Sequence, residues 1–590
     1  MKKTMISLLL ALILLLTGCS REFQVDTRIK ISLMSGEGYT VEESGQWVMP
    51  GDDAVFTLTM SQGCSLASVD YHGAYDYVVE DGKIILTLKA VRYPDRIRVL
   101  TTTRYCTVTY DPNGGEGDPV TKNYSMDTHL RPNTENAAAL FRRSGYTLVS
   151  WNTRPDGSGT RIGLGSRFTA EPEQTLYAQW ARWSPAEDFR YTVTQFGTVT
   201  INAYLGSDET VVIPNVIENH PVTTVAAGAF RNSTLRHVIL PVNMDQIAPD
   251  AFKDSALETV TLFDNIVTVS DASFDGCANL KTLYINAIEP PYGYSFRKES
   301  MYADKVDKLI LAQGRKKMVF YSGCSVWYNL NGAEAYKTFG SDYVILNMGL
   351  NGTVNSAVQM QILGSFMEKG DVLLHTLELA SPYQLLSDVR MGAGDDKLWC
   401  GLENNYDLFA LVDLQTVEGE FDSLVQYLEK KDGMTTYQNS YIDEQGNDYL
   451  DEYGCVPFRR TESQEKLADR VRLDPSLITQ DGMTRLSRYY DRYADKGVTV
   501  YVSYACVNMD AVPEDQQGNV KDMDTLVRNS VEAMGSGKLI SKLEDFLFTN
   551  GDFYDTNYHL LSRQAKANTA IWLRDLQEQM AADGLWEVAE

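Results

Sequence analysis

The chain has 590 residues, of which 44% are hydrophobic, and a formal net charge of −26 at neutral pH. This length exceeds what one hydrophobic core usually organises, so the sequence predicts several domains. The excess of acidic residues excludes a nucleic-acid-binding surface, which would have to be basic to displace the counterions of the phosphates.

The first nineteen residues have the pattern of a secretion signal, in which two lysines precede an apolar run from Leu8 to Leu16. Leu16-Thr17-Gly18-Cys19 resembles the bacterial lipobox, whose cysteine is acylated and becomes the new N-terminus. The resemblance implies that residues 1–19 are a lipoprotein signal peptide. It also implies that Cys19 anchors the protein to the extracellular face of the cell membrane. No later segment has the roughly twenty consecutive apolar residues of a membrane-spanning helix.

Seven cysteines follow Cys19 without a C-x-x-C pair, so no metal-binding spacing is present. An odd number leaves at least one thiol outside any disulfide, and a bridge between Cys400 and Cys455 remains conceivable. With no metal or nucleotide motif in the chain, we expect no cofactor.

Two β-rich modules are predicted next. Residues 20–104 alternate apolar and polar positions, as in Ala54 to Met60, which predicts half-buried strands of a small β-domain acting as a stalk. Residues 105–182 contain the turn Asp111-Pro-Asn-Gly-Gly and strands ending at Trp151 and Trp180. These strings resemble the internalin-type β-grasp repeat of bacterial surface proteins, and we expect the tryptophans to lie in its core.

Residues 186–290 contain an internal repeat. The pairs Ala229-Phe230, Ala251-Phe252 and Ser273-Phe274 recur at a spacing of 22, while the strand of the third copy slips by one residue. Each unit is too small to bury its own apolar face, so the copies must stack into a short solenoid with one strand per repeat. The pattern resembles the BspA-like leucine-rich repeats of bacterial surface antigens. It predicts three or four units with an architectural role.

After Glu289-Pro-Pro, strands alternate with helical stretches, which predicts that residues 300–590 form a doubly wound α/β domain able to fold alone. The predicted strands are 318–321, 343–346, 372–376 and 498–504, and the predicted helices are 356–367, 422–430, 484–495, 524–548 and 565–582. Residues 381–480 interrupt this pattern as an acidic insertion that is expected to form a lid or wall of a substrate cleft.

The strand ending at Tyr321 is followed by Ser322-Gly323-Cys324-Ser325, which resembles the Gly-Asp-Ser block of the SGNH/GDSL hydrolases, with Asn329 where that block has a second glycine. Asn347 to Thr353 is similar to their second block. Asp555-Thr-Asn-Tyr-His559 resembles their Asp-x-x-His block with one extra residue. The third block, Gly-x-Asn-Asp, is missing, and Leu377-Glu378-Leu379 stands in its place.

The resemblance implies a flavodoxin-like SGNH fold and a serine esterase or acyltransferase. Ser325 would attack an acyl carbonyl, His559 would accept its proton and Asp555 would orient His559. The N–H groups of Ser325 and Gly352 would hold the oxyanion. The implied substrates are O-acyl groups on cell-envelope or extracellular carbohydrate, and hydrolysis and acyl transfer both remain open.

Three residues near this motif carry alternatives. Cys324 has the more nucleophilic side chain, but the family pattern has its variable residue there, so Ser325 is assigned the attack. Glu378 either replaces the missing asparagine or, if ionised, has to turn away from an oxyanion. His375 lies inside a buried strand and is expected to be a hydrogen-bonded core residue.

The interpretation that follows is a lipid-anchored surface protein whose β-rich stalk carries a serine esterase. The alternative is a non-catalytic adhesin or scaffold with a degenerate SGNH fold, whose repeats bind surface proteins. The sequence leaves both open.

Overall fold

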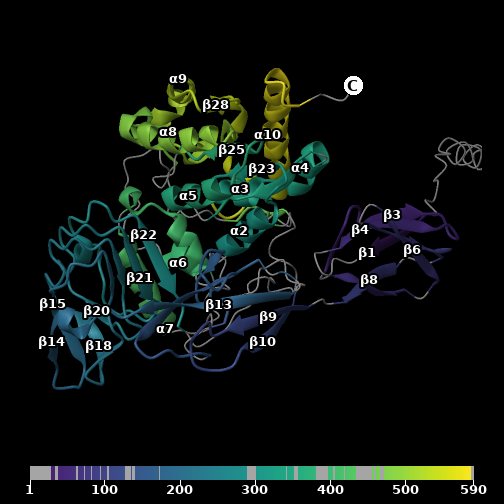
Figure 1. The fold of residues 1–590 in the computed structure, drawn as a ribbon. Coiled ribbons are helices and arrows are strands. Elements are labelled where there is room, and N and C mark those ends of the chain that lie inside the picture. The colour runs from purple at the N-terminus through teal and green to yellow at the C-terminus, as the bar shows by residue number, and fades with distance from the viewer. Residues whose placement is uncertain are drawn as a thin grey trace, which may run out of the picture. The chain divides into compact units, whose positions relative to one another are not determined.

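The computed structural model describes most of the chain and forms two compact units, one ending at Tyr105 and the other containing the residues from Cys106 onward except 125–128 (Figure 1). The described residues are 28–33, 38–60, 64–71, 73–80, 83–92, 95–102, 105–125, 134–135, 140–169, 171, 173–288, 301–340, 342–350, 356–379, 396–402, 405–417, 419–432, 453, 455–456, 460–464 and 471–586. Within them, no helix is both long and apolar enough to cross a bilayer.

The first unit contains two four-stranded sheets, in the orders β3-β1-β8-β5 and β2-β4-β7-β6. The predicted alternation is present in β4, where Phe56 and Leu58 are buried in the unit's core and Val55 is exposed. The strands are β1 Ile29–Leu33, β2 Tyr39–Val41, β3 Gly45–Val48, β4 Ala54–Met60, β5 Ser65–Asp70, β6 Tyr75–Glu80, β7 Lys83–Leu88 and β8 Asp95–Thr102.

The second unit begins with a five-stranded sheet in the order β10-β9-β13-β11-β12. In the predicted turn after β9, Asn113 and Gly114 have φ values of 47° and 83°, the left-handed region that such a turn requires. Trp151 is fully buried, as expected, and its indole N–H donates to the Glu135 carbonyl, whereas Trp180 is only partly buried. The strands are β9 Tyr105–Asp111, β10 Val120–Ser125, β11 Tyr146–Asn152, β12 Arg161–Ile162 and β13 Glu173–Arg182.

The next segment is a solenoid whose central sheet, β16-β19-β21-β22, is parallel. Val238 pairs with Val260 at the predicted spacing of 22, and Val260 pairs with Leu283, which is the predicted slip of one residue. A second sheet has the order β14-β15-β18-β17, with β20 on β18. The strands are β14 Phe189–Val193, β15 Val199–Tyr204, β16 Thr210–Val212, β17 Val216–Ile217, β18 His220–Val225, β19 His237–Ile239, β20 Gln246–Ile247, β21 Thr259–Phe263 and β22 Thr282–Asn286.

The repeated phenylalanines form a continuous column of stacked rings inside the solenoid. Phe230, Phe252 and Phe274 stack with centroids 4.7 and 5.3 Å apart. The column does not stop at the last repeat, because Phe421 of helix α7 (Glu420–Asp432) stacks on Phe274 at 4.5 Å. The carboxylate of Asp271 accepts hydrogen bonds from the backbone N–H groups of Gly419 and Phe421 at the start of that helix.

The α7 end of the predicted insertion therefore covers the end of the solenoid. Helix α6 (Asp396–Leu402) packs on α7, and the short helices η6 (Tyr406–Leu411) and η7 (Leu414–Thr416) lie between them in the chain. The side-chain amide of Gln415 donates to the Leu280 carbonyl at 2.6 Å, and the Leu414 N–H donates to the Lys281 carbonyl. A lid or wall of a substrate cleft was expected of this insertion, whereas η6, η7 and α7 pack against the repeats.

The C-terminal part is built on a parallel sheet in the order β24-β23-β25-β26-β28. Counted along the chain, this order is 2-1-3-4-5, which is the doubly wound arrangement that the alternation of strands and helices predicts. The first four strands fall where they are expected. Their bounds are β23 Lys317–Tyr321, β24 Val344–Asn347, β25 Val372–Leu377, β26 Thr499–Tyr504 and β28 Lys538–Leu539.

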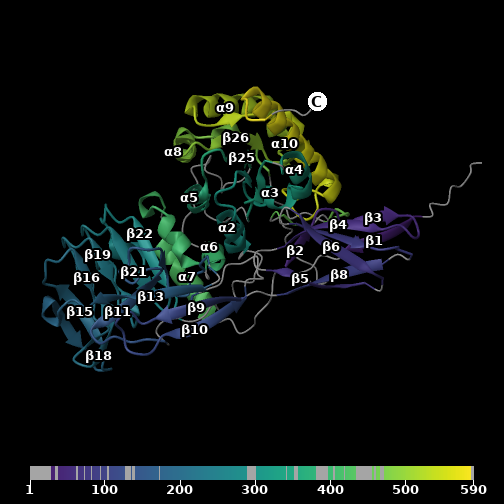
Figure 2. The same cartoon turned by 45° about the vertical axis from the view of Figure 1, so that its right-hand side comes forward.

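Helices cover both faces of this sheet (Figure 2). α8 packs on α5 and α9, whereas α10 packs on α3 and α4. The helix expected over 524–548 is shorter than predicted, because α9 ends where Gly535 adopts a left-handed φ of 76° and β28 follows. The helices are α2 Met301–Leu311, α3 Cys324–Asn329, α4 Gly332–Phe339, α5 Ser356–Phe366, α8 Gln480–Asp495, α9 Val520–Met534 and α10 Ser562–Ala582.

Buried polar contacts also join the β-grasp module to the rest of the second unit. Arg167 and Asp307 of α2 form an ion pair at 2.7 Å in which both side chains are at least 95% buried. Arg161 pairs with Asp407 of η6 at 2.7 Å, and the N–H of Gly163 donates to the same carboxylate. The β-grasp module, the repeats and the α/β sheet thus share one packed unit.

Candidate functional site

Helix α3 places the predicted nucleophile at the sheet's topological switch point. β23 ends at Tyr321 and its neighbours β24 and β25 lie on opposite sides, so loops leaving their carboxyl ends diverge there. Gly323 precedes the helix, and a Cβ at this position would lie 2.6 Å from a carboxylate oxygen of Glu378. A larger residue at position 323 would therefore displace the carboxyl group of Glu378.

Ser325 is held by Glu378, the residue that follows β25. The hydroxyl of Ser325 donates to Oε1 of Glu378 at 2.5 Å, and the backbone N–H of Ser325 donates to the same oxygen at 3.0 Å. Burial raises the pKa of Glu378, and these two hydrogen bonds partly oppose that rise. Ser325 itself is 0% exposed. The structure therefore directs the hydroxyl of Ser325 to a buried carboxyl group.

Asp555 and His559 come together as the sequence predicts. Nδ1 of His559 and Oδ1 of Asp555 are 2.7 Å apart, which fixes the orientation of the imidazole. Burial acts to raise the pKa of Asp555, but the hydrogen bond and the charge of His559 outweigh it, so the pKa is lowered. The extra residue in this block fits a closed loop, because the Tyr554 N–H donates to the His559 carbonyl and Phe553 bridges to Leu560.

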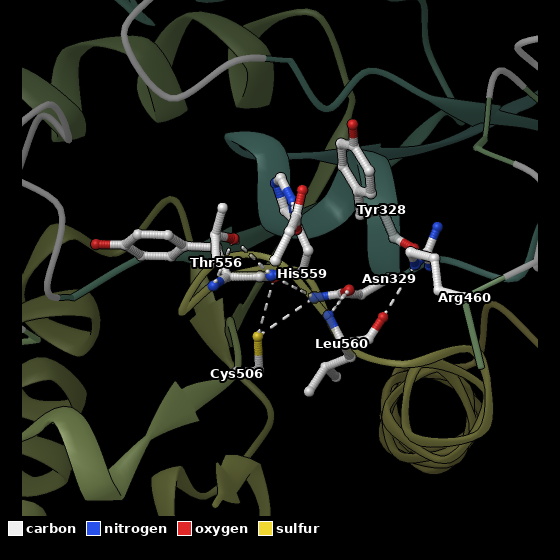
Figure 3. A network of polar contacts seen from close by, with 9 residues as sticks. Tyr328, Asn329, Arg460, Cys506, Thr556, His559 and Leu560 are labelled. Atoms are coloured by element: carbon white, nitrogen blue, oxygen red, sulfur yellow. Dashed lines mark hydrogen bonds and ion pairs between the residues drawn. The ribbon is translucent and has the colours of Figure 1, made fainter. Parts of the chain in front are cut away.

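Two residues of α3, Tyr328 and Asn329, contact the loop from Phe553 to Leu560 that carries His559, here called the histidine loop (Figure 3). The sequence did not predict these contacts. The ring of Tyr328 stacks on the imidazole of His559, with centroids 3.7 Å apart and planes at 10°. The amide of Asn329 donates to the Tyr558 carbonyl and accepts from the Leu560 N–H, so it holds the backbone on both sides of His559.

Arg460 also stabilises the contact between α3 and the histidine loop, and it lies near the ring of Tyr328 (Figure 3). Its guanidinium lies 5.2 Å from the Tyr328 ring centroid and donates to the carbonyls of Tyr328 and Leu560. No sequence motif marks Arg460, which lies 132 residues after Tyr328.

The second predicted block also packs on α3. Asn347, at the end of β24, donates from its side-chain amide to the Val326 carbonyl and accepts from the Gly349 N–H. A Cβ at Gly349 would lie 2.4 Å from the backbone nitrogen of Trp327, so this approach requires glycine. The buried ammonium of Lys305 donates to the carbonyls of Asn347 and Gly349.

The predicted site residues are therefore only partly assembled. His559 and Asp555 are paired, while Ser325 hydrogen-bonds to Glu378, and the structure gives no Ser325–His559 hydrogen bond between these described residues. Gly352 and Cys19 lie outside the described residues. His375 is a core residue as expected, buried and 2.8 Å from the Tyr490 hydroxyl. In the described part of the chain, no group of three His, Cys, Asp or Glu side chains is placed to hold a metal.

Comparison with known proteins identifies both repeat modules. Residues 207–306 match six copies of the BspA type leucine-rich repeat region, which is more than the three or four units predicted. Residues 106–179 match the Listeria-Bacteroides repeat domain. The chain contains BspA-type leucine-rich repeats and a Listeria-Bacteroides repeat. Both matches end before α3, so the SGNH resemblance of the last part stays a prediction from its own residues.

Individual relatives cover short parts of the chain. A protein of Evansella cellulosilytica with the name "Putative membrane protein" is 38% identical over 78 residues, which are 12% of this chain and 11% of that protein. A leucine-rich repeat protein of T. pallidum is 21% identical over 17% of this chain and 71% of its own, with a TM-score of 0.13. A leucine-rich cell surface protein of Faecalibacterium prausnitzii is 15% identical over 33% of this chain and 45% of its own, with a TM-score of 0.15.

Proposed function

We propose that the protein is a binding scaffold of the bacterial cell surface, in which the repeats and the α/β sheet act as one body. The column of rings that runs from the repeats into α7 carries this proposal, because its last pair, Phe274 and Phe421, joins the two parts through a buried contact. The full burial of Ser325 against Glu378 favours this function over serine hydrolysis. Acylated carbohydrate, cell-wall polymer and surface proteins are the proposed partners.

The proposed location rests on two observations about the sequence. Leu16-Thr17-Gly18-Cys19 has the pattern of a lipid-attachment site, and a relative that matches 78 residues of the chain has the name "Putative membrane protein". One acyl-modified cysteine would hold the protein on the extracellular face of the membrane without a spanning helix.

Limited proteolysis of cells that display the full chain tests the single-body proposal. We expect protease to release one particle that contains both the repeats and the α/β sheet, measured by size-exclusion chromatography without denaturant so that nicked segments stay together. Release of the α/β sheet alone, with the repeats left on the cells, would contradict the proposal.

A second candidate is an SGNH-type serine esterase or acyltransferase, which the 2.7 Å pair of Asp555 and His559 favours. In this mechanism the hydroxyl of Ser325 gives up its hydrogen bond to Glu378, passes its proton to His559 and attacks an acyl carbonyl. The N–H groups of Ser325 and Gly352 then hold the oxyanion. Hydrolysis of p-nitrophenyl acetate that is lost in both Ser325→Ala and His559→Ala would support this candidate.

A further inference from the structure

Two nucleophilic side chains, Cys324 and Ser325, stand next to each other at the start of α3. Successive residues of a helix project about 100° apart, so the two side chains face different surroundings. Ser325 faces the interior, where Glu378 accepts from both its hydroxyl and its N–H. Its hydroxyl is therefore already engaged by a carboxyl group.

Cys324 lies beside Tyr328, the residue of α3 whose ring stacks on His559. Residues four apart on a helix are neighbours on one face, with about 5–6 Å between their Cβ atoms, and Tyr328 is four residues after Cys324. The Tyr328 ring lies 3.7 Å from the imidazole of His559, centroid to centroid. Cys324 packs against the cluster of Trp327 and Tyr328 and is partly exposed, unlike Ser325.

We propose that Cys324 is the nucleophile of the C-terminal part, with His559 as its base and Asp555 as the residue that orients His559. This activity goes beyond the scaffold function and takes a carboxylic ester as substrate. A thiol suits this role because a histidine base favours the thiolate, which is the reactive form.

The reaction has two balanced steps. His559 takes the proton of the Cys324 thiol, the sulfur attacks the acyl carbon, the C–O bond breaks, and the leaving alcohol receives that proton from His559. In the second step His559 takes a proton from water or from an acceptor hydroxyl, whose oxygen attacks the thioester. The C–S bond breaks and the thiolate regains the proton, so no oxidant or cofactor is required.

Alkylation of the full chain by iodoacetamide at pH 7, with peptide mass spectrometry at each cysteine, tests the reactivity. Cys64 is the internal control, because it has the same intermediate exposure as Cys324 and lies in the other unit. Activation by His559 should make Cys324 react about tenfold faster than Cys64. His559→Gln should remove this difference and leave the rate of Cys64 unchanged. Equal rates in the parent, or a Cys324 rate unaffected by His559→Gln, would overturn the proposal.

Acyl transfer is tested with p-nitrophenyl acetate and mapping of the acetyl group. The proposal expects acetyl on Cys324, a burst of p-nitrophenol that Cys324→Ala abolishes, and a burst that Ser325→Ala retains. Circular dichroism melting of each variant shows whether it is folded. Acetyl on Ser325 supports the serine mechanism instead, and acetyl on neither residue rejects both chemistries. Neither result bears on the proteolysis test of the scaffold.

Discussion

Phe421→Ala tests whether α7 closes the column of the repeats. The side chain is 5% exposed and stacks on Phe274 at 4.5 Å. Truncation of a buried phenylalanine costs about 3–5 kcal/mol, which includes about 0.5–1.5 kcal/mol for the ring pair. Because the ring contacts the last repeat, the loss should weaken both sides of the contact.

Hydrogen exchange of backbone amides measures this loss locally. In Phe421→Ala, amides of β22 and of α7 should both exchange about 10²- to 10⁴-fold faster, which is the same free energy expressed as a rate ratio. Leu411→Ala is the matched control, because Leu411 lies in the same insertion and is 42% exposed, so it should change stability by less than about 0.5 kcal/mol. Faster exchange in α7 with unchanged β22 would refute the capping role.

Three further predictions concern the buried carboxyl, the domain boundary and the anchor. Burial raises the pKa of Glu378 above 4.5, so ionisation of its carboxyl group costs stability as the pH rises above that value. Glu378→Gln should therefore be more stable than the parent at pH 7, but not at pH 4, in urea unfolding. A variant that loses more stability at pH 7 than at pH 4 would contradict this prediction. The sequence predicts that a Met301–Glu590 fragment folds alone. The structure predicts instead that this fragment does not unfold cooperatively, because it lacks Phe274 and Arg167, the partners of Phe421 and Asp307. A sharp unfolding transition would support the sequence-based prediction. Cys19→Ala should move the protein from the membrane fraction to the soluble fraction, and unchanged fractionation argues against a lipid anchor.

The sequence predicts the local architecture well because the relevant signals are local. The 22-residue spacing appears directly as the pairing of Val238 with Val260, and the alternation of strands and helices gives the parallel sheet. The Asp555–His559 pair was predictable because the two residues lie four positions apart in one loop.

The contacts that were not predicted join residues far apart in the chain. Phe421 stacks on Phe274 from a segment 147 residues later, and a single aromatic residue gives no periodic signal of its partner. Glu378 stands where an asparagine was expected, so the family pattern did not indicate that it would bind Ser325. The stacking of Tyr328 on His559 depends on the orientation of α3, which a motif of a few residues does not determine.

Labelling of the full chain with a fluorophosphonate probe, followed by peptide mass spectrometry, tests the central claim most directly. The probe reacts with serines that an adjacent base activates. Because Ser325 is fully buried and its hydroxyl is bound by Glu378, we predict no adduct at Ser325. An adduct at Ser325 that disappears in His559→Ala would contradict the account and establish the serine mechanism.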